Sequence, residues 1–285
     1  MTHVLGVIGG SGLYAIEGVT ELEELKVSTP YGSPSDPVTR GRIGDTSVLF
    51  LPRHGNGHRI SPSEINYRAN ICALKMLGAT QVISISAVGS LRESICPGDV
   101  VIVDQYIDRT YRRVGTFFEG GMVAHVSLAD PTCPQLAAAA RSAAATAGAT
   151  VHGRGTYVCI EGPQFSTRAE SKVYRSFDAD VIGMTAMPEA RLAREAELPY
   201  VTVAFATDYD CWHQSEEDVT VEQVLAVLKK NGSLARRLIV ELAKCLPDPS
   251  ESIAYRALKD AIMTNQAATS PEARTRLAWL LDARH

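Results

Sequence analysis

The sequence lacks several features that would restrict its class. No run of apolar residues reaches the roughly 18 that a membrane-spanning helix needs, and the opening MTHVLGVIGGSG has no basic segment of a secretory signal. The six cysteines form no CxxC pair, which indicates reduced thiols. Neither an H-E-x-x-H zinc motif nor a P-loop occurs. These absences predict a soluble, cytoplasmic protein without a metal site.

An excess of either charge is also missing. The chain has 28 Lys and Arg against 32 Asp and Glu, a formal net charge of −4. No basic field would attract nucleic acid or an anionic membrane, so a small molecule is the expected partner. Hydrophobic residues make up 45 % of the chain and charged residues 21 %, which is typical of a globular protein.

Short apolar runs alternate with helical segments along the chain. We expect strands at 3–9, 46–51, 80–86, 99–107, 155–161, 180–184 and 200–206. We expect helices at 134–147, 168–177, 188–197 and 220–245, and one that begins at the capping box Ser61-Pro62-Ser63-Glu64 and ends near Gly78. This alternation predicts a single α/β/α layered domain with a central mixed sheet.

A proline-rich break, Pro247-Asp248-Pro249, separates this domain from the end of the chain. We place the domain at 1–247 and a C-terminal extension at 248–285. The extension is predicted to form one or two amphipathic helices, the second capped by Ser270-Pro271-Glu272. It is expected to pack on the domain or on a neighbouring subunit.

Small, polar or basic residues follow several of the predicted strands. The glycine-rich turn around Ser11 offers backbone amides to an anion, Arg53 and His54 share a glycine-flexed loop, and two further strand ends carry hydroxyls. Ligands of α/β sheets collect at strand ends. We therefore expect one phosphate to be bound jointly by Ser11, Arg53, His54, Ser86 and Thr185.

Two aspartates follow the buried strand 200–206, in the stretch TDYDCWH. If strand geometry continues, Asp208 and Asp210 point to the same side, and their repulsion would keep one of them protonated near neutral pH. A solvated loop is the alternative explanation of this stretch. The chain from Gly10 to Ala15 also fits G-x-G-x-x-A, but the expected crossover helix is missing, so a nicotinamide oxidoreductase is only a distant alternative.

Taken in order, these segments resemble the trimeric purine nucleoside phosphorylase family, and within it the members that cleave 5′-methylthioadenosine. The likeness covers about residues 3–245 and rests on strings such as GGSGLY, RHGNGH, SAVGSLRE, EGPQFSTRAES, MPEARLARE and ATDYDCW. It implies a phosphorylase-type fold, a homotrimer or a dimer of trimers, phosphate as co-substrate, and no metal or organic cofactor. The implied phosphate site consists of Ser11, Arg53, His54, Ser86, Ala87 and Thr185.

The resemblance also implies which base is cleaved. Members that act on 6-oxopurines have asparagine at the position of Asp208 and glutamate at that of Ser166. A carboxylate accepts a hydrogen bond from a 6-amino group but repels a 6-oxo oxygen, so adenine is favoured. Asp208 is expected to protonate N7 of the base as a general acid, and Asp210 to bind its 6-amino group.

Further substrate contacts are expected around the ribose. Val221, Val224 and Leu225 lie on one face of a predicted helix and would surround a 5′ thioether, unless they are ordinary core residues. The implied set also contains Phe165, Ser166 and Met184, together with His125, which would reach the site of a neighbouring subunit. Gly183 departs from the asparagine of many members. The alternatives are a purine nucleoside or methylthioinosine phosphorylase and a non-catalytic nucleotide-binding protein.

Overall fold

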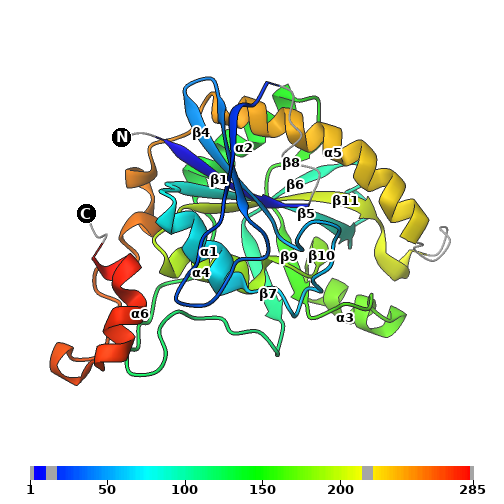
Figure 1. Ribbon diagram of the computed structural model, residues 1–285. Helices are drawn as coiled ribbons and strands as arrows, with labels where there is room; N and C mark the ends of the chain where they lie inside the picture. The colour runs from blue at the N-terminus through cyan, green and yellow to red at the C-terminus, as the bar shows by residue number, and fades with distance from the viewer. Residues whose placement is uncertain (1–2, 11–17, 214–220, 283–285) are drawn as a thin grey trace.

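The computed structural model describes residues 3–10, 18–213 and 221–282, with the backbone only for 221–230. Eleven strands of this part form one mixed sheet with helices on both faces (Figure 1). The strands are β1 (Val4–Gly9), β2 (Thr20–Leu25), β3 (Val38–Ile43), β4 (Thr46–Pro52), β5 (Gln81–Ser90), β6 (Val100–Val103), β7 (Gln105–Arg109), β8 (Val151–His152), β9 (Thr156–Ile160), β10 (Val181–Gly183) and β11 (Tyr200–Asp208). The α-helices are α1 (Tyr67–Met76), α2 (Pro134–Thr146), α3 (Arg168–Ser176), α4 (Ala186–Glu195), α5 (Val221–Ala243) and α6 (Pro271–Leu281).

Strand β5 lies at the centre of the sheet. It pairs in parallel with β1 and β11, and its last residues pair antiparallel with β10. Strand β1 pairs in parallel with β4 on its other side. The carboxyl ends of β1, β4, β5 and β11 therefore meet at one edge of the sheet, the place where ligands of α/β sheets bind.

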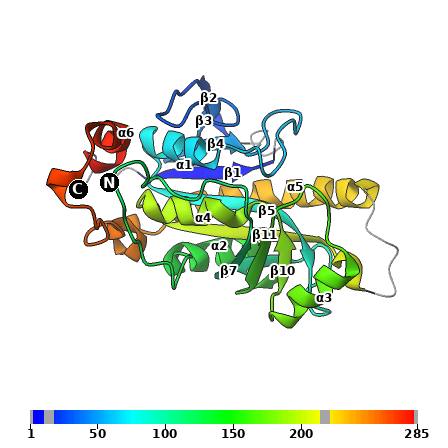
Figure 2. The same ribbon diagram turned by 90° about the horizontal axis from the view of Figure 1, so that it is seen from below.

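Alternation along β5 separates the two layers of the core. Val82 and Val88 face a cluster that contains side chains of α1 and α4, whereas Ile83 and Ile85 face a cluster that contains side chains of α2 and α5. In Figure 1 the sheet lies between α2 and α5 above it and α1 and α4 below it, and Figure 2 views the molecule from the side of α1 and α4. The predicted α/β/α fold with a mixed central sheet is confirmed.

Helix α1 begins later than the sequence predicts. Ser61 and Glu64 do interact, since the Ser61 hydroxyl donates to the Glu64 carboxylate at 2.6 Å, but they close a separate turn. The helix begins at Tyr67, where the side chain of Asn66 accepts the backbone N–H of Ala69. The predicted interaction between Ser61 and Glu64 is present, but it belongs to this turn and does not begin helix α1.

Strands β2, β3 and β8 were not predicted, and 99–107 divides into β6 and β7. Strand β2 reads TELEEL and is exposed along nearly its whole length, so it has no apolar periodicity. It is held by antiparallel pairing with β3. Pairing between strands is a long-range property that the local pattern does not carry.

The C-terminal extension contains one α-helix and several short turns. Pro249–Glu251 and Ile253–Arg256 form single 3₁₀ turns where an amphipathic helix was expected. Helix α6 begins as predicted, with the Ser270 side chain accepting the N–H of Ala273. Leu277 of α6 is buried in the cluster shared with α1 and α4. In the described part of the chain, no helix combines the length and apolarity needed to span a membrane.

Candidate active site

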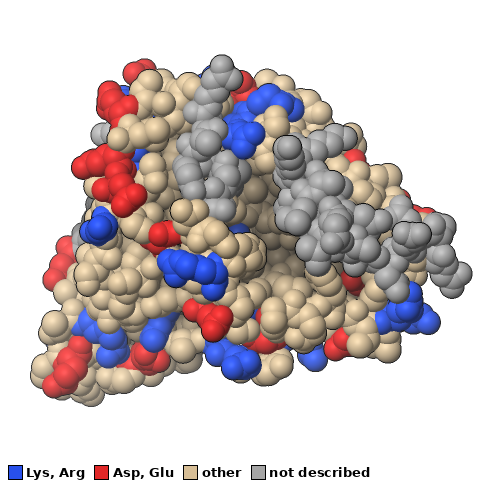
Figure 3. All heavy atoms as spheres, turned by 45° about the vertical axis from the view of Figure 1, so that its right-hand side comes forward, with Lys and Arg blue, Asp and Glu red and all other residues tan. Residues whose placement is uncertain are grey.

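A cavity of about 810 Å³ lies at the edge where the parallel strands end. This volume suits a ligand of nucleoside size. In Figure 3 one face of the molecule is hollowed near its centre, and the walls of the hollow are mainly uncharged. The predicted residues that line the cavity are Arg53, His54, Ser86, Ala87, Phe165, Ser166, Met184, Thr185, Asp208 and Asp210.

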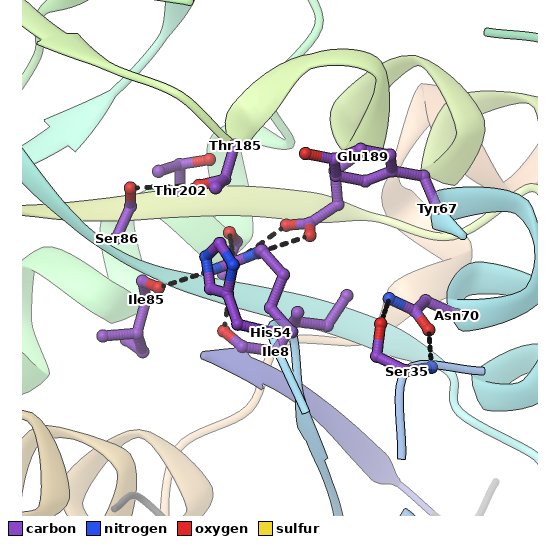
Figure 4. A network of polar contacts seen from close by, with 12 residues as sticks. Ile8, Ser35, His54, Tyr67, Asn70, Ile85, Ser86, Thr185, Glu189 and Thr202 are labelled. Atoms are coloured by element: carbon purple, nitrogen blue, oxygen red, sulfur yellow. Dashed lines mark hydrogen bonds and ion pairs between the residues drawn. The ribbon is translucent and has the colours of Figure 1, made fainter. Parts of the chain in front are cut away.

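Two hydroxyls face each other at one end of the cavity. Ser86 Oγ of β5 lies 3.4 Å from Thr185 Oγ1, at the start of α4, and Figure 4 shows the contact. Ala87 follows Ser86 and is the exposed residue of an otherwise buried strand. Hydroxyls and backbone amides are neutral donors that can serve an anion without bringing a counter-charge.

The Arg53 guanidinium is held from behind by a carboxylate. Its Nε and Nη2 donate to Glu189 at 2.8 and 3.1 Å, and the two side chains are 3 % and 1 % exposed (Figure 4). Burial would lower the pKa of Arg53, but the charge and hydrogen bonds of Glu189 outweigh burial and hold this pKa above its usual value. The bidentate contact expected with phosphate is therefore made with Glu189. Nη1 donates to the carbonyl of Ile85 and has a second hydrogen for a ligand.

His54 is a neutral imidazole at the wall of the cavity. Burial, aided by the charge of Arg53, lowers the pKa of His54 to about 4. Its Nδ1 lies 2.8 Å from the carbonyl of Ile60, so Nδ1 carries the proton and Nε2 is an acceptor. The ring stacks on His58, with 4.2 Å between centroids. His54 Nε2 can thus accept a hydrogen bond from the P–O–H group of a monohydrogen phosphate.

Asp208 and Asp210 line the same cavity. In the sheet, Asp208 pairs with Gly89, three residues beyond Ser86 in β5. Strand geometry stops at Asp208, because Asp210 has φ +51° and begins a short 3₁₀ turn. Asp208 accepts the hydroxyl of Thr207 at 2.6 Å and the backbone N–H of Asp210 at 2.8 Å. Strand alternation therefore does not set the direction of both side chains, yet both carboxylates reach the same cavity.

The surroundings of the Asp210 carboxyl affect both its protonation and its hydrogen bonding. Burial raises the pKa of Asp210, and the nearby Asp208 charge acts in the same direction. Its Oδ2 is buried without a hydrogen-bond partner among the described residues. A buried acceptor without a donor is costly, so it favours a ligand that brings an N–H group. Gly89 makes room for the pair, since a Cβ there would lie 3.0 Å from Asp208 Oδ1.

Several predicted residues do not line this cavity or cannot be located. His125 is exposed and pairs through its backbone N–H with Ala261 of the C-terminal extension, away from the cavity lining. Ser11 and the side chains of Val221, Val224 and Leu225 lie outside the described residues.

Sequence reasoning missed other residues of the site. Glu189 and Tyr157 lie directly behind it; Glu189 belongs to the quoted string MPEARLARE, but no role was assigned to either residue. Further along α5, the cavity is lined by Asn231, Gly232, Ala235 and Arg236. Their spacing of three to four residues marks one helix face, on the same helix that carries Val221, Val224 and Leu225.

The comparisons with known proteins agree with this geometry. Residues 4–244 match the model of the Phosphorylase superfamily. The chain belongs to this superfamily. The resemblance inferred from the sequence strings is thereby confirmed.

Relatives and solved structures cover nearly the whole chain. It is 52 % identical over 282 residues to an S-methyl-5′-thioadenosine phosphorylase of Geobacter sulfurreducens, covering 99 % of both chains. A methylthioadenosine phosphorylase from an antarctic soil metagenomic library has a TM-score of 0.93 at 50 % identity, covering 98 % of this chain and 99 % of that one. The methylthioadenosine phosphorylase of Schistosoma mansoni, solved with adenine, has a TM-score of 0.81 at 34 % identity and covers 100 % and 99 %.

Proposed function

We propose that the protein cleaves S-methyl-5′-thioadenosine with inorganic phosphate, releasing adenine and 5-methylthioribose 1-phosphate. The observation that carries this is one cavity lined both by anion-competent donors and by two aspartates. The identity of about 50 % to curated phosphorylases of this substrate supports the same activity. The roles assigned to the individual site residues are part of the same proposal.

Phosphate binds at the end formed by Ser86, Thr185 and Arg53. The two hydroxyls and the remaining Nη1 hydrogen donate to phosphate oxygens, and His54 Nε2 accepts a hydrogen bond from the P–O–H group of a monohydrogen phosphate, which keeps its proton. Ala87 contributes through its backbone. We assign Ser11 to the same site from the sequence. The bound anion is then both the nucleophile and a counter-charge to the ribosyl cation.

The purine binds at the aspartate end of the cavity. A phosphate oxygen attacks C1′ while the C1′–N9 bond breaks, so the electron pair of that bond enters the purine. We assign Asp208 as the acid that places a proton on N7, and Asp210 as the acceptor of the 6-amino group. Burial raises the pKa of Asp210, and the charge of Asp208 raises it further, so a proton is more readily held at this pair of carboxyls. Phe165, Ser166 and Met184 complete the pocket for base and ribose.

The remaining features follow the resemblance. The side chains of Val221, Val224 and Leu225 are proposed to contact the methylthio group, and His125 to reach the 5′ pocket of a neighbouring subunit in a homotrimer or a dimer of trimers. We propose that phosphate is the only co-substrate and that no cofactor is needed. A cytoplasmic location stays a prediction from the scattered cysteines. The division into a domain at 1–247 and an extension at 248–285 also stays a prediction, based on the proline-rich break at 247–249.

The test is adenine release with and without phosphate. Purified protein is incubated with S-methyl-5′-thioadenosine in phosphate buffer and in phosphate-free buffer, and the free base is separated by chromatography. We expect adenine only when phosphate is present. Equal rates in both buffers would identify a hydrolase, and faster cleavage of inosine or methylthioinosine would identify a 6-oxopurine phosphorylase.

A further inference from the structure

The buried hydroxyl of Tyr157 lies beside the site and takes no part in the phosphorolysis proposed above. Tyr157 of β9 is fully buried and does not line the cavity. Its Oη lies 3.3 Å from Ser86 Oγ and accepts the backbone N–H of Thr185 at 3.4 Å. Tyr157 therefore contacts the two hydroxyl residues of the phosphate end from behind.

The position of this ring depends on a glycine. A Cβ at residue 183 would lie 2.0 Å from Tyr157 Oη and 2.6 Å from its Cζ, distances at which non-bonded atoms overlap. A Cβ there would also meet Val88 at 3.2 Å, so it would point into the protein. Gly183 is the residue at which the sequence departs from the asparagine of the family. The phenol occupies the space that a side chain at 183 would need.

Phosphate imposes a direction on the hydroxyl protons. Ser86 and Thr185 each have one hydroxyl proton, and both must point to an anion for both to bind it. Their oxygens are 3.4 Å apart, and Ser86 Oγ also lies 3.4 Å from the carbonyl oxygen of Ala87 and 3.3 Å from Tyr157 Oη, so the Ser86 proton has several acceptors that compete with an anion. Tyr157 Oη already accepts from the Thr185 amide, which leaves its own proton for Ser86 Oγ. Burial raises the pKa of Tyr157 to about 12, so this proton is present at neutral pH.

We propose that Tyr157 is a positioning residue of the phosphate site, whose hydroxyl donates to Ser86, so that the Ser86 proton is not given to Tyr157 and can point to the bound anion. Gly183 is the residue that makes room for it. The inference rests on the proposed phosphorolysis. The proposal also explains why this chain has glycine at 183, where many family members have asparagine. A side chain at 183 would collide with Tyr157 of the neighbouring strand β9, and Tyr157 supplies the hydroxyl that donates to Ser86.

Tyr157→Phe tests the hydroxyl, because it keeps the ring that fills the core. We expect the KM for phosphate to rise about tenfold, in the range of losing a hydrogen bond to a charged ligand network, while the KM for S-methyl-5′-thioadenosine changes less than twofold. The matched control is Tyr31→Phe, since Tyr31 packs on Phe117 and Trp279 and lies outside the cavity lining. Both constants should be unchanged in the control. A phosphate KM within twofold of wild type, or an equal rise in both constants, overturns the positioning role.

Gly183→Ala gives an independent second test. The added methyl group must displace the phenol, so we expect a rise in phosphate KM at least as large as that of Tyr157→Phe. The two effects should not add, because the double variant has already lost the hydroxyl. Additive effects would contradict the coupling. Calorimetric titration of phosphate alone into wild type and Tyr157→Phe separates this inference from the proposed function, since weaker phosphate binding can be measured even if no adenine is released.

Discussion

At the scale of residues, the two aspartates differ although they are only two positions apart. Asp208 ends a strand and receives hydrogen bonds from Thr207 and from the backbone of Asp210. Asp210 has a left-handed backbone conformation and a raised pKa caused by burial. A left-handed conformation is uncommon outside glycine and is often retained where it directs a functional side chain. The pair is therefore suited to separate duties.

Asp208→Asn tests these duties. Asparagine keeps the size of the side chain but cannot give a proton to N7, so we expect kcat for S-methyl-5′-thioadenosine to fall by about 10²- to 10⁴-fold. Discrimination against inosine should narrow, because an amide can donate to a 6-oxo group. The matched variant Asp210→Asn should mainly raise the KM for the nucleoside. Steady-state constants for both nucleosides decide, and wild-type turnover by Asp208→Asn would exclude this carboxyl as the acid.

Residue types at strand ends were predictable from the sequence, but their partners were not. The loop RHGNGH indicates an anion-binding Arg53, yet nothing near it in the sequence points to Glu189, which is 136 positions away and accepts hydrogen bonds from Nε and Nη2 of the guanidinium. The sequence gives no signal for Tyr157 either, because a tyrosine within an apolar run is expected to be an ordinary core residue. The side chains that touch a ligand follow strand-end rules, whereas those behind them depend on tertiary packing.

At the scale of elements, the Arg53–Glu189 pair joins α4 to the end of β4. Glu189 accepts from two nitrogens of Arg53 and from the hydroxyl of Tyr200 in β11, all in the interior. Arg53 also donates to Ser84 of β5 at 2.7 Å. One buried charge pair thus fixes the relative positions of a helix and three strands around the phosphate end.

Glu189→Gln should be strongly destabilising. The substitution keeps the shape but leaves the buried Arg53 charge without its counter-ion, which typically costs about 3–5 kcal/mol. The control is Glu23→Gln, which breaks an exposed pair with Arg40 at 3.5 Å and should cost less than about 1 kcal/mol. Urea unfolding at one fixed protein concentration measures both. Similar losses of unfolding free energy in the two variants would show that the buried pair contributes no more to stability than the exposed one.

The strong periodic elements were predicted correctly, and the weak ones were not. Strand β11 and helices α2, α3 and α5 follow from their apolar patterns to within one or two residues. The first turn of α1 was misplaced because Ser61 and Glu64 satisfy a capping pattern within a turn. Residues 253–256 were expected in a helix but form a single 3₁₀ turn, and the side chain of Leu258, two residues beyond this turn, is buried within the core. Tertiary contacts override propensity in such short segments.

At the scale of the whole molecule, part of the surface beside the C-terminal extension is apolar. Val123 is 46 % exposed and Met263 is 64 % exposed, and the two are joined by a backbone hydrogen bond. His125 lies in the same pair of segments, bonded to Ala261. Exposed apolar side chains that lie together are a feature of surfaces where proteins associate. The resemblance to a trimeric family gives the expected number of copies.

We therefore expect three copies to associate, with His125 of each copy beside the 5′ end of a neighbour's substrate. Light scattering should give about three times the 30.7 kDa of one chain, or six times if trimers pair. His125→Ala should raise the KM for S-methyl-5′-thioadenosine by about two- to tenfold, the range of one lost hydrogen bond, without changing the KM for phosphate. Because His125 is exposed and outside the cavity lining of its own chain, such an effect has a direct cause only in the oligomer. A monomeric mass with full activity would remove His125 from the site and leave the apolar surface without this explanation.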